Sequence, residues 1–502
     1  MSYRNVGDTE CQEAHDERKA ASHVGACCKN GTSARASAES KDPSPQSSGA
    51  SGDSARLQSK FRPGTDWLVV GGWEFVAPID PGYDEPLPIV NSRLLQLQPY
   101  PFEKLRALLA GLTPAGRPIP LSIGEPQHAT PDLIRRAITD HLDGLSSYPA
   151  TAGHDSVRAA IASWFERRYN LKALNPHTQV LPVNGTREAL FAFGQAVIDP
   201  SRANPVVVSP NPFYQIYEGA ALLAGAEPLF LNQTEQTGFA LDLDSLGPEQ
   251  WSRTQLLYVC SPANPSGRVL TLDEWRALFD RADKYGFVIA SDECYSEIYD
   301  EQAPLGALEA AQRLGRDGFV NLVVFNSLSK RSNAPGLRAG AVAGDAKLLE
   351  RFLLYRTYHG CAMSRVVQEA SIAAWNDETH VADNRRQYRE KFDALIPMLQ
   401  PVMHSPRPEA GFYIWARIPD GDDEAFARTL FADTHVTVLP GQYLARDAHG
   451  TNPGRGYVRM ALVPALADCV EAAQRIVAFC HTRYADVYDH YSRARIADRR
   501  SL

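Results

Sequence analysis

Lys330 is the residue of this chain whose neighbours point most clearly to covalent chemistry. In the segment 326–340, Ser327 and Ser329 precede it and Arg338 follows it. A lysine amine can form a Schiff base with an aldehyde, and hydroxyls with a guanidinium fork suit a phosphate. The segment therefore predicts attachment of a phosphorylated aldehyde cofactor, pyridoxal 5′-phosphate (PLP), rather than an ordinary solvated surface lysine.

A carboxylate, a phenol and a carboxamide lie upstream of this lysine, at Asp292, Tyr295 and Asn264. A buried carboxylate beside the pyridine nitrogen keeps that nitrogen protonated, so that the ring can accept electrons. We predict this role for Asp292, against the alternative of capping the turn after its strand; alternation directs Glu293 to the other face. Tyr295 and Asn264 are expected to hydrogen-bond the ring's 3-oxygen, although Asn264 also fits a plain turn.

The phosphate needs donors, and the start of a predicted helix supplies them. Gly185, Thr186 and Arg187 lie at a strand-to-helix junction. Helix N-termini present N–H groups and a positive dipole end to anions. These three residues are the predicted phosphate contacts, together with the serines and the arginine around Lys330.

Two further side chains are expected to hold the ring and the substrate. Tyr214 is predicted to stack on the pyridine face, with Phe213 or Tyr217 as alternatives. Arg459 lies in a short strand between apolar neighbours, where a guanidinium needs an anionic partner. We expect that partner to be the substrate α-carboxylate, with a structural Asp or Glu as the alternative.

The elements that must position these residues are buried parallel strands with helical crossovers. Continuous apolar runs predict strands, and helical spacing predicts helices over 102–111 and 131–142, the latter capped by Thr130. Ligands in such sheets bind beyond the carboxyl ends of the strands. Asn264, Asp292 and Lys330 each follow a predicted strand and should converge there. The strands are expected at 205–209, 255–260, 287–291 and 322–326.

The chain is expected to divide into five parts. Residues 1–90 are poor in large apolar side chains, cannot offset their ordering entropy, and are predicted to be disordered. Because valine codons can start bacterial translation, we interpret the part before Val90 as an upstream gene-model extension. The other predicted parts are an N-terminal arm with part of a small domain (91–130), a large cofactor-binding domain (131–375), a small α+β C-terminal domain (376–485) and a tail (486–502).

The composition excludes several classes of protein. With 44% hydrophobic residues the 502-residue chain can bury a large core, and a net charge of −8 argues against nucleic-acid binding. There is neither a membrane-length apolar run nor a signal-peptide core, so we expect a cytoplasmic protein without a membrane span. The eight cysteines make no disulfide scaffold. Cys11, His15, His23 and Cys27 match no standard zinc spacing, so no metal site is predicted.

Taken together, these residues resemble the fold-type-I PLP-dependent aminotransferases of class I/II, over roughly residues 92–485. The family usually has threonine where this chain has Ser266. The resemblance implies an α/β fold, with a large domain on a mostly parallel sheet and a smaller α+β domain. The matching motifs are Ser-Leu-Ser-Lys at 327–330 with Arg338, Asn-Pro-Ser-Gly at 264–267, Asp292 with Tyr295, and Arg459.

The resemblance adds two residues and a partner. It implies that Gly124 approaches the substrate carboxylate through its backbone N–H, and that Tyr148 donates to the phosphate of a neighbouring subunit. It therefore implies a homodimer with active sites at the interface. Amino-acid and 2-oxo-acid substrates are the small-molecule partners that the family would bind.

Within the family, the stretches 95–104, 210–217 and 355–363 resemble N-succinyldiaminopimelate aminotransferases of bacterial lysine biosynthesis. That resemblance implies transfer of an amino group from N-succinyl-LL-2,6-diaminopimelate to 2-oxoglutarate. A second cationic contact is then expected for the distal substrate carboxylate, and it is left open among Arg331, Arg356 and His359.

Other functions stay open at this level. Another class I/II aminotransferase (aspartate, alanine or methionine type) or a PLP-dependent β-lyase would use the same lysine. A transcription regulator would need a winged helix-turn-helix within residues 1–90, which lack helical periodicity and a basic face. A PLP-free binding protein on this fold is disfavoured by Lys330 with Asp292.

Overall fold

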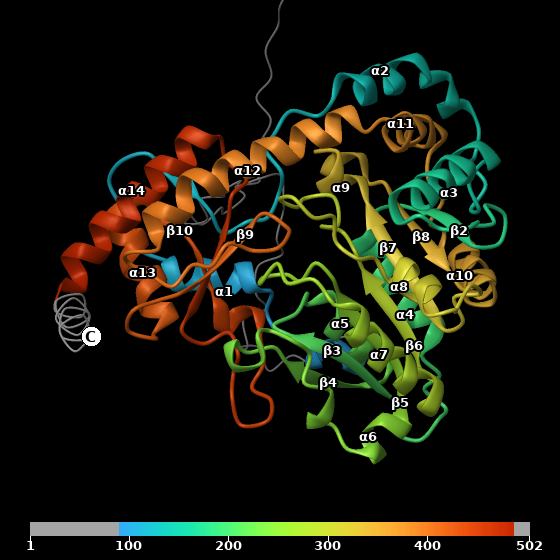
Figure 1. Cartoon of the computed structure of the whole chain (residues 1–502), viewed down its shortest axis with the longest axis horizontal. Coiled ribbons are helices and arrows are strands. Elements are labelled where there is room, and N and C mark those ends of the chain that lie inside the picture. The colour runs from blue at the N-terminus through green and yellow to red at the C-terminus, as the bar shows by residue number, and fades with distance from the viewer. Residues whose placement is uncertain (1–89, 486–502) are drawn as a thin grey trace, which may run out of the picture. The chain divides into compact units, whose positions relative to one another are not determined.

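The computed structural model describes residues 90–485, and its centre is one sheet of seven strands in that part of the chain (Figure 1). The strand order is β2-β8-β7-β6-β5-β3-β4, with β3 to β7 parallel and β8 antiparallel to both of its neighbours. The predicted mostly parallel α/β sheet is confirmed. Its strands are β2 (Val180–Val183), β3 (Val206–Asn211), β4 (Glu227–Asn232), β5 (Thr254–Cys260), β6 (Val288–Asp292), β7 (Leu322–Ser327) and β8 (Gly340–Gly344).

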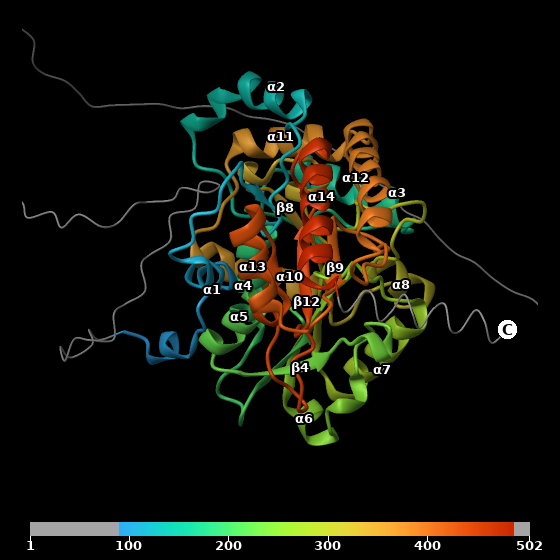
Figure 2. The same cartoon turned by 90° about the vertical axis from the view of Figure 1, so that its left-hand side faces the viewer.

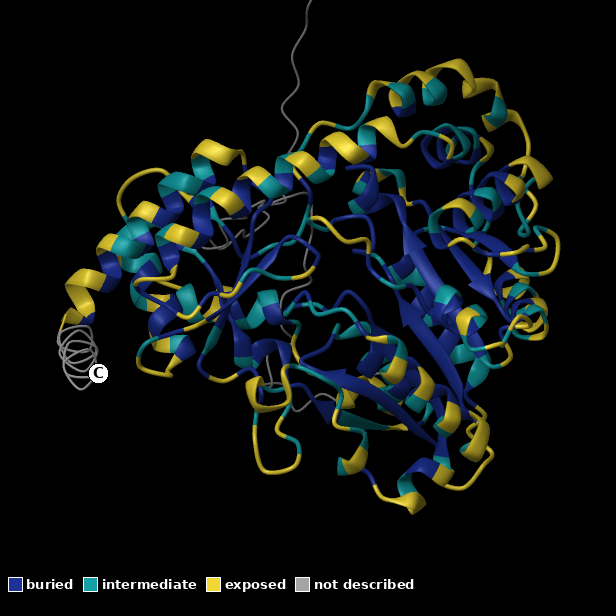
Figure 3. Cartoon of the chain, viewed as in Figure 1, coloured by how far each residue is buried: buried dark blue, intermediate teal, exposed yellow. Residues whose placement is uncertain are grey.

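Helices cover both faces of this sheet, so its central strands are buried on both sides (Figure 3). Alternation along β3 sends Val206 and Val208 into one core and Val207 into the other. Helices α3 (Asp155–Tyr169), α7 (Leu272–Tyr285), α8 (Ala307–Arg313) and α11 (Arg365–Trp375) contribute to the first core, and α4 (Thr186–Val197), α5 (Ile216–Ala224) and α10 (Ala346–His359) to the second.

A smaller antiparallel sheet follows the long helix α12 (Thr379–Leu399). Its order is β11-β12-β9, and β1 pairs in parallel with β10 beside it. Helices α13 and α14 lie side by side over these strands (Figure 2). The α+β character predicted after residue 376 is confirmed, whereas the domain boundaries stay a prediction. The elements are β1 (Ile119–Pro120), β9 (Tyr413–Arg417), β10 (Val436–Thr437), β11 (Leu439–Pro440), β12 (Tyr457–Ala461), α13 (Asp423–Thr434) and α14 (Leu466–Arg483).

The predicted helix cap at Thr130 is wrong. Pro131 occupies the N-cap position of α2, and the Thr130 hydroxyl instead donates to the carbonyl of Asn333 at 2.9 Å. This bond ties the start of α2 to the segment after Lys330. The remaining helices are α1 (Pro101–Leu109), α2 (Asp132–Asp140), α6 (Pro248–Arg253) and α9 (Leu328–Arg331), with 3-10 turns at Ser92–Gln96, Leu142–Ser146, Glu235–Thr237, Leu243–Ser245, Pro335–Leu337 and Gly441–Leu444.

Several predictions lie outside the described residues. These are the disordered N-terminal extension up to residue 89, its cysteines and histidines, and the tail at 486–502. Within residues 90–485, none of the helices combines the length and the apolar character that a membrane-spanning segment requires.

Candidate active site

Lys330 lies at the carboxyl ends of the parallel strands. It belongs to the short helix α9, which begins directly after β7. The hydroxyl of Ser327, the last residue of that strand, accepts a hydrogen bond from the Ser329 N–H at 3.1 Å and caps the helix. Both serines are buried. The cap fixes the turn that carries Lys330 to the carboxyl end of the strands, as predicted.

The Lys330 amine is held in a poorly solvated position. Its Nζ donates to the carbonyl of Gly124 at 2.6 Å and lies 5.6 Å from the centroid of the Phe412 ring. Burial lowers the pKa of Lys330 to about 8, and the positive charges of Arg187 and Arg459 act in the same direction. An amine with this pKa is partly unprotonated near neutrality, which a nucleophile and proton carrier requires.

Asp292 ends β6, and the residue is 5% exposed. Oδ2 accepts from the Tyr217 hydroxyl at 2.8 Å, and Oδ1 accepts from the Cys294 N–H at 3.2 Å. Burial raises the pKa of Asp292, and these two donors oppose the rise. Glu293 faces away, where the Tyr169 hydroxyl donates to it at 2.8 Å. Asp292 is thus the carboxylate that the fold presents at this edge of the sheet. Tyr217, which the sequence analysis names only as an alternative for stacking, supports it through a hydrogen bond.

A cradle for an anion forms between Gly185 and Arg338. Gly185 has φ +87° at the N-cap of α4, and a β-carbon there would collide with the guanidinium of Arg338. Arg338 also donates to the Pro335 carbonyl at 2.8 Å, and the Thr186 hydroxyl lies 2.9 Å from the sulfur of Cys294. Backbone N–H groups at a helix start and a guanidinium fork are the donors that a phosphate takes.

Tyr214 and Arg187 bind each other beside this cradle. The Arg187 Nε donates to the Tyr214 hydroxyl at 2.5 Å, and burial raises the pKa of Tyr214 well above its usual value. The Tyr214 ring meets Tyr217 edge to face, with centroids 5.8 Å apart. That the Tyr214 ring faces the cofactor stays a prediction.

Arg459 is a buried guanidinium without a carboxylate partner among the described residues. It is 4% exposed and donates to Asn264 Oδ1 at 3.1 Å and to the Ser122 carbonyl at 2.9 Å. Its Nε is buried and has no hydrogen-bond acceptor in the described part of the chain. The structural Asp or Glu that we considered as its partner is therefore absent from residues 90–485. A buried arginine in this state is suited to an incoming carboxylate.

Tyr413, which the sequence analysis did not single out, contacts three of the predicted site residues: Tyr295, Arg459 and Gly124. The Tyr413 hydroxyl lies 3.1 Å from that of Tyr295, and the Arg459 guanidinium lies 4.4 Å from the Tyr413 ring centroid. A β-carbon at Gly124 would collide with the Tyr413 hydroxyl, so glycine is required there. Only the aromatic run in the segment 411–417 hinted at Tyr413 in the sequence.

Two of the three candidates for the distal carboxylate already have carboxylate partners in this chain. Arg331 is buried and donates to Glu378 at 2.6 Å and to the Ala374 carbonyl at 2.7 Å. Arg356 is buried and donates to Glu188 at 2.6 Å. Both arginines are therefore engaged in structural ion pairs within this chain. His359 is exposed, and so is Tyr148, whose side chain makes no hydrogen bond or ring contact within residues 90–485.

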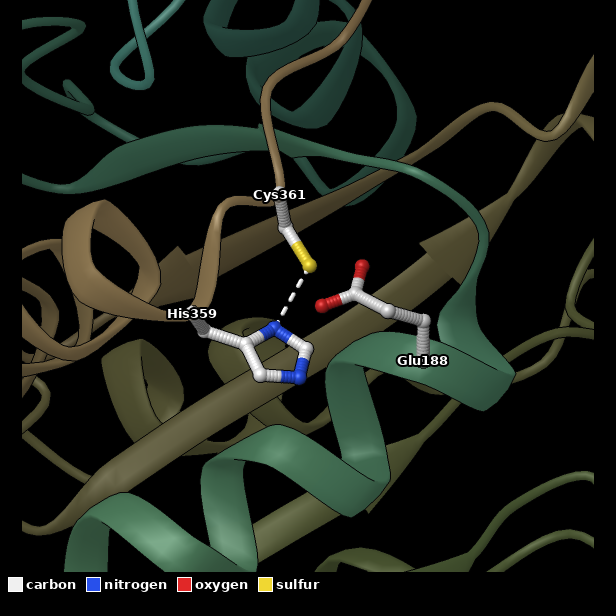
Figure 4. Close-up of side chains that lie close together, drawn as sticks. All are labelled: Glu188, His359 and Cys361. Atoms are coloured by element: carbon white, nitrogen blue, oxygen red, sulfur yellow. Dashed lines mark hydrogen bonds between the residues drawn. The ribbon is translucent and has the colours of Figure 1, made fainter.

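Three side chains of metal-ligand type gather near the end of α10 (Figure 4). His359 Nδ1 lies 2.6 Å from the sulfur of Cys361, and both face Glu188 of α4. Burial and the Glu188 carboxylate raise the pKa of the Cys361 thiol to about 11, and Arg356 neutralises the Glu188 charge. His359 and Cys361 hydrogen-bond each other and Arg356 binds Glu188, so all three side chains have partners within the chain. The absence of a metal site stays a prediction.

Comparison with known proteins identifies the family. Residues 117–476 match the family model "Aminotransferase class I and II". The chain belongs to this family. An LL-diaminopimelate aminotransferase from Desulforudis audaxviator (strain MP104C) is 33% identical to this aminotransferase over 394 residues, which cover 77% of this chain and 96% of that relative.

Two solved structures extend the comparison. An aminotransferase from Neisseria meningitidis Z2491 is 55% identical, with a TM-score of 0.76, covering 78% of this chain and 100% of its own. Aminotransferase AspB from Helicobacter pylori 26695 is 37% identical, with a TM-score of 0.71, covering 77% of this chain and 99% of its own. The predicted fold type and transaminase class are confirmed.

Members of this family use PLP, and the aminotransferase is a PLP-dependent enzyme. Its residues fit that cofactor. The space beside Gly185 and Arg338 suits the phosphate, buried Asp292 suits the pyridine nitrogen, and the Lys330 amine suits the aldehyde carbon. The individual cofactor and substrate contacts stay predictions.

Proposed function

We propose that the aminotransferase moves the α-amino group of N-succinyl-LL-2,6-diaminopimelate to 2-oxoglutarate, giving 2-succinylamino-6-oxopimelate and glutamate. One observation supports an α-carboxylate substrate above all. Arg459 is buried, hydrogen-bonded only to neutral groups, and unpaired with any carboxylate of residues 90–485. A bound substrate carboxylate would supply the anionic partner that Arg459 lacks.

The chain's own residues take distinct roles in this proposal. Arg459 and the Asn264 amide fix the substrate carboxylate, with the Gly124 backbone N–H approaching it. Lys330 carries the proton between the substrate α-carbon and the cofactor. PLP, when bound, supplies the electron sink that makes that α-hydrogen acidic. Asp292, with the hydrogen bond from Tyr217, would keep the pyridine nitrogen protonated. Tyr295 would orient the ring.

The phosphate roles are proposed for the residues at the cradle. Gly185, Thr186 and Arg187 lie at the start of α4, and Arg338 faces Gly185. Ser327 and Ser329 belong to the same group on the cap of the Lys330 helix. We assign Tyr148 to the phosphate of a second copy; its fully exposed side chain in the single chain is compatible with that role. A cytoplasmic homodimer follows as an expectation.

Unmodified LL-diaminopimelate is the second candidate donor. Its support is the relatives of about one-third identity, which are named LL-diaminopimelate aminotransferases. The two donors share the reacting end and differ at the far amino group. In one donor it is a neutral amide whose succinyl group ends in a carboxylate, and in the other it is an ammonium group. The resemblance of 95–104, 210–217 and 355–363 supports the acylated donor.

The test is the kcat/KM of the purified protein for both donors with 2-oxoglutarate, with glutamate formation measured directly. We expect the succinylated donor to give the higher kcat/KM of the two. A preference for LL-diaminopimelate would replace the donor and keep the aminotransferase. No spectral change of the bound cofactor with either donor would refute the proposal for both.

A further inference from the structure

Lys391 of α12 is a buried ammonium group with unusual partners. It is 2% exposed, and its Nζ donates to His128 Nε2 at 2.6 Å, to the Leu462 carbonyl at 2.9 Å and to the Val463 carbonyl at 3.4 Å. No carboxylate of residues 90–485 forms an ion pair with it. A buried ion without a counter-charge carries a desolvation cost, which the three acceptors around Lys391 offset.

The contacts of Lys391 give the hydrogen-bond chain a direction. An ammonium group has only donors, so His128 Nε2 must accept, and its proton lies on Nδ1. Nδ1 then donates to Asn384 Oδ1 at 2.9 Å. The Asn384 amide nitrogen donates in turn to the carbonyl of Lys330 at 3.0 Å and to that of Arg331 at 3.3 Å. Burial and Lys391 both lower the pKa of His128, which keeps the imidazole neutral.

The chain joins the three segments that carry the site. Leu462 and Val463 directly follow β12, on which Arg459 lies. His128 follows Gly124 in the loop whose carbonyl receives the Lys330 amine. Asn384 holds the carbonyl of Lys330 itself. These segments are distant in sequence, and Lys391 with its partners connects them directly.

Aromatic rings support the same connection. The Tyr388 ring lies 4.5 Å from the His128 ring and stacks on Phe412 at 5.3 Å between centroids. Phe412 in turn lies against the Lys330 amine. A shift of α12 would therefore be transmitted to Lys330 both through its backbone carbonyl and through the ring beneath its Nζ.

We propose that Lys391, His128 and Asn384 form a positioning chain that sets where the Lys330 amine stands relative to Arg459. The inference rests on the proposed roles of Lys330 and Arg459 and is independent of which donor the enzyme uses. These three are positioning residues, since they act through the backbone that carries Lys330.

The test compares Lys391→Met and Asn384→Leu with Arg158→Met. Arg158 is a matched control, because it is also a buried cation held by backbone carbonyls, those of Val180 and His177, and it has no contact with the site residues. The first readout is the pH dependence of acetic anhydride labelling of Lys330 in cofactor-free protein, followed by mass spectrometry. The second is kcat and KM in the holoenzyme with the better donor.

For the two chain variants, we expect the Lys330 labelling midpoint to differ from that of the wild type by at least about half a pH unit. We expect kcat to fall roughly tenfold to a hundredfold with a smaller change in KM, because the amine is misplaced while Arg459 still binds the carboxylate. Arg158→Met should leave the midpoint and kcat unchanged.

A pair at His128 keeps the test decisive if the other variants fold poorly. His128→Gln retains one acceptor and one donor and should keep the wild-type labelling midpoint and kcat. His128→Leu has neither group, so its labelling midpoint should shift and its kcat should fall. The inference is overturned if the chain variants change only the melting temperature, which is the result expected of Arg158→Met. It is also overturned if the Lys330 labelling midpoint of His128→Leu equals that of the wild type. Failure of the proposed donor would leave the labelling result unaffected, so the two failures are distinguishable.

Discussion

Replacing Arg459 by Met separates a functional arginine from a structural one. Two of its N–H groups bind Asn264 and the Ser122 carbonyl, and Nε is buried without an acceptor in the described part of the chain. The guanidinium N–H groups that these two bonds do not use are available for a two-point contact with a carboxylate. A hydrogen bond to a charged group contributes about 1.5–3 kcal/mol, so two correspond to a roughly 10²- to 10⁴-fold loss of kcat/KM.

The stability of the same variant should change little. Removing an arginine that is paired with a buried carboxylate costs about 3–5 kcal/mol, because the partner is left charged. Here Arg459→Met loses two hydrogen bonds of about 1 kcal/mol each and removes the desolvation cost of an unpaired ion. We therefore expect the free energy of unfolding of cofactor-free protein to change by no more than about 1 kcal/mol in urea.

The assay pairs these two measurements with a control donor. An amine that lacks the α-carboxylate should lose little activity in Arg459→Met, because the lost contact is absent in both proteins. The pKa of Lys330 should also rise, since Arg459 helps to lower it. A stability loss of about 3–5 kcal/mol, or an equal activity loss for the carboxylate-free amine, would refute the reasoning.

Three further predictions follow from the buried groups near the sheet. Tyr217→Phe removes a donor that lowers the pKa of Asp292, so the acid limb of the pH–kcat profile should move to higher pH; an unmoved limb would contradict this. Gly185→Ala forces a β-carbon against Arg338 at positive φ and should weaken PLP binding at least about tenfold in a fluorescence titration, whereas an unchanged Kd would contradict it. Burial raises the pKa of Glu293 from 4.5 to about 7. The folded state therefore holds the extra proton, and stability is lost as pH rises through this range, by about 3 kcal/mol in total. Glu293→Gln should remove that loss between pH 5 and 8 in urea unfolding, and equal slopes in both proteins would count against it.

The sequence determined the chemistry of the site and the sheet that carries it. Lys330 with its serines, Asp292 and Asn264 follow runs of apolar residues that can only be buried strands, and parallel strands end at one edge. Residue type and local spacing are sufficient for that inference, because each motif lies within a few residues of its strand. The local capping prediction at Thr130 failed because the helix begins one residue later than predicted, at Asp132, so that Pro131 occupies the N-cap position.

Only the tertiary structure decided which charged groups are paired. Arg331, Arg356 and Arg459 look alike in sequence, yet the first two bind Glu378 and Glu188 while Arg459 meets no carboxylate within residues 90–485. Tyr217 beneath Asp292, Tyr413 against Gly124, and the contacts of Lys391 likewise join residues far apart in the chain. Such partners depend on how separate elements pack, and the packing of distant segments leaves no periodic pattern in a single sequence.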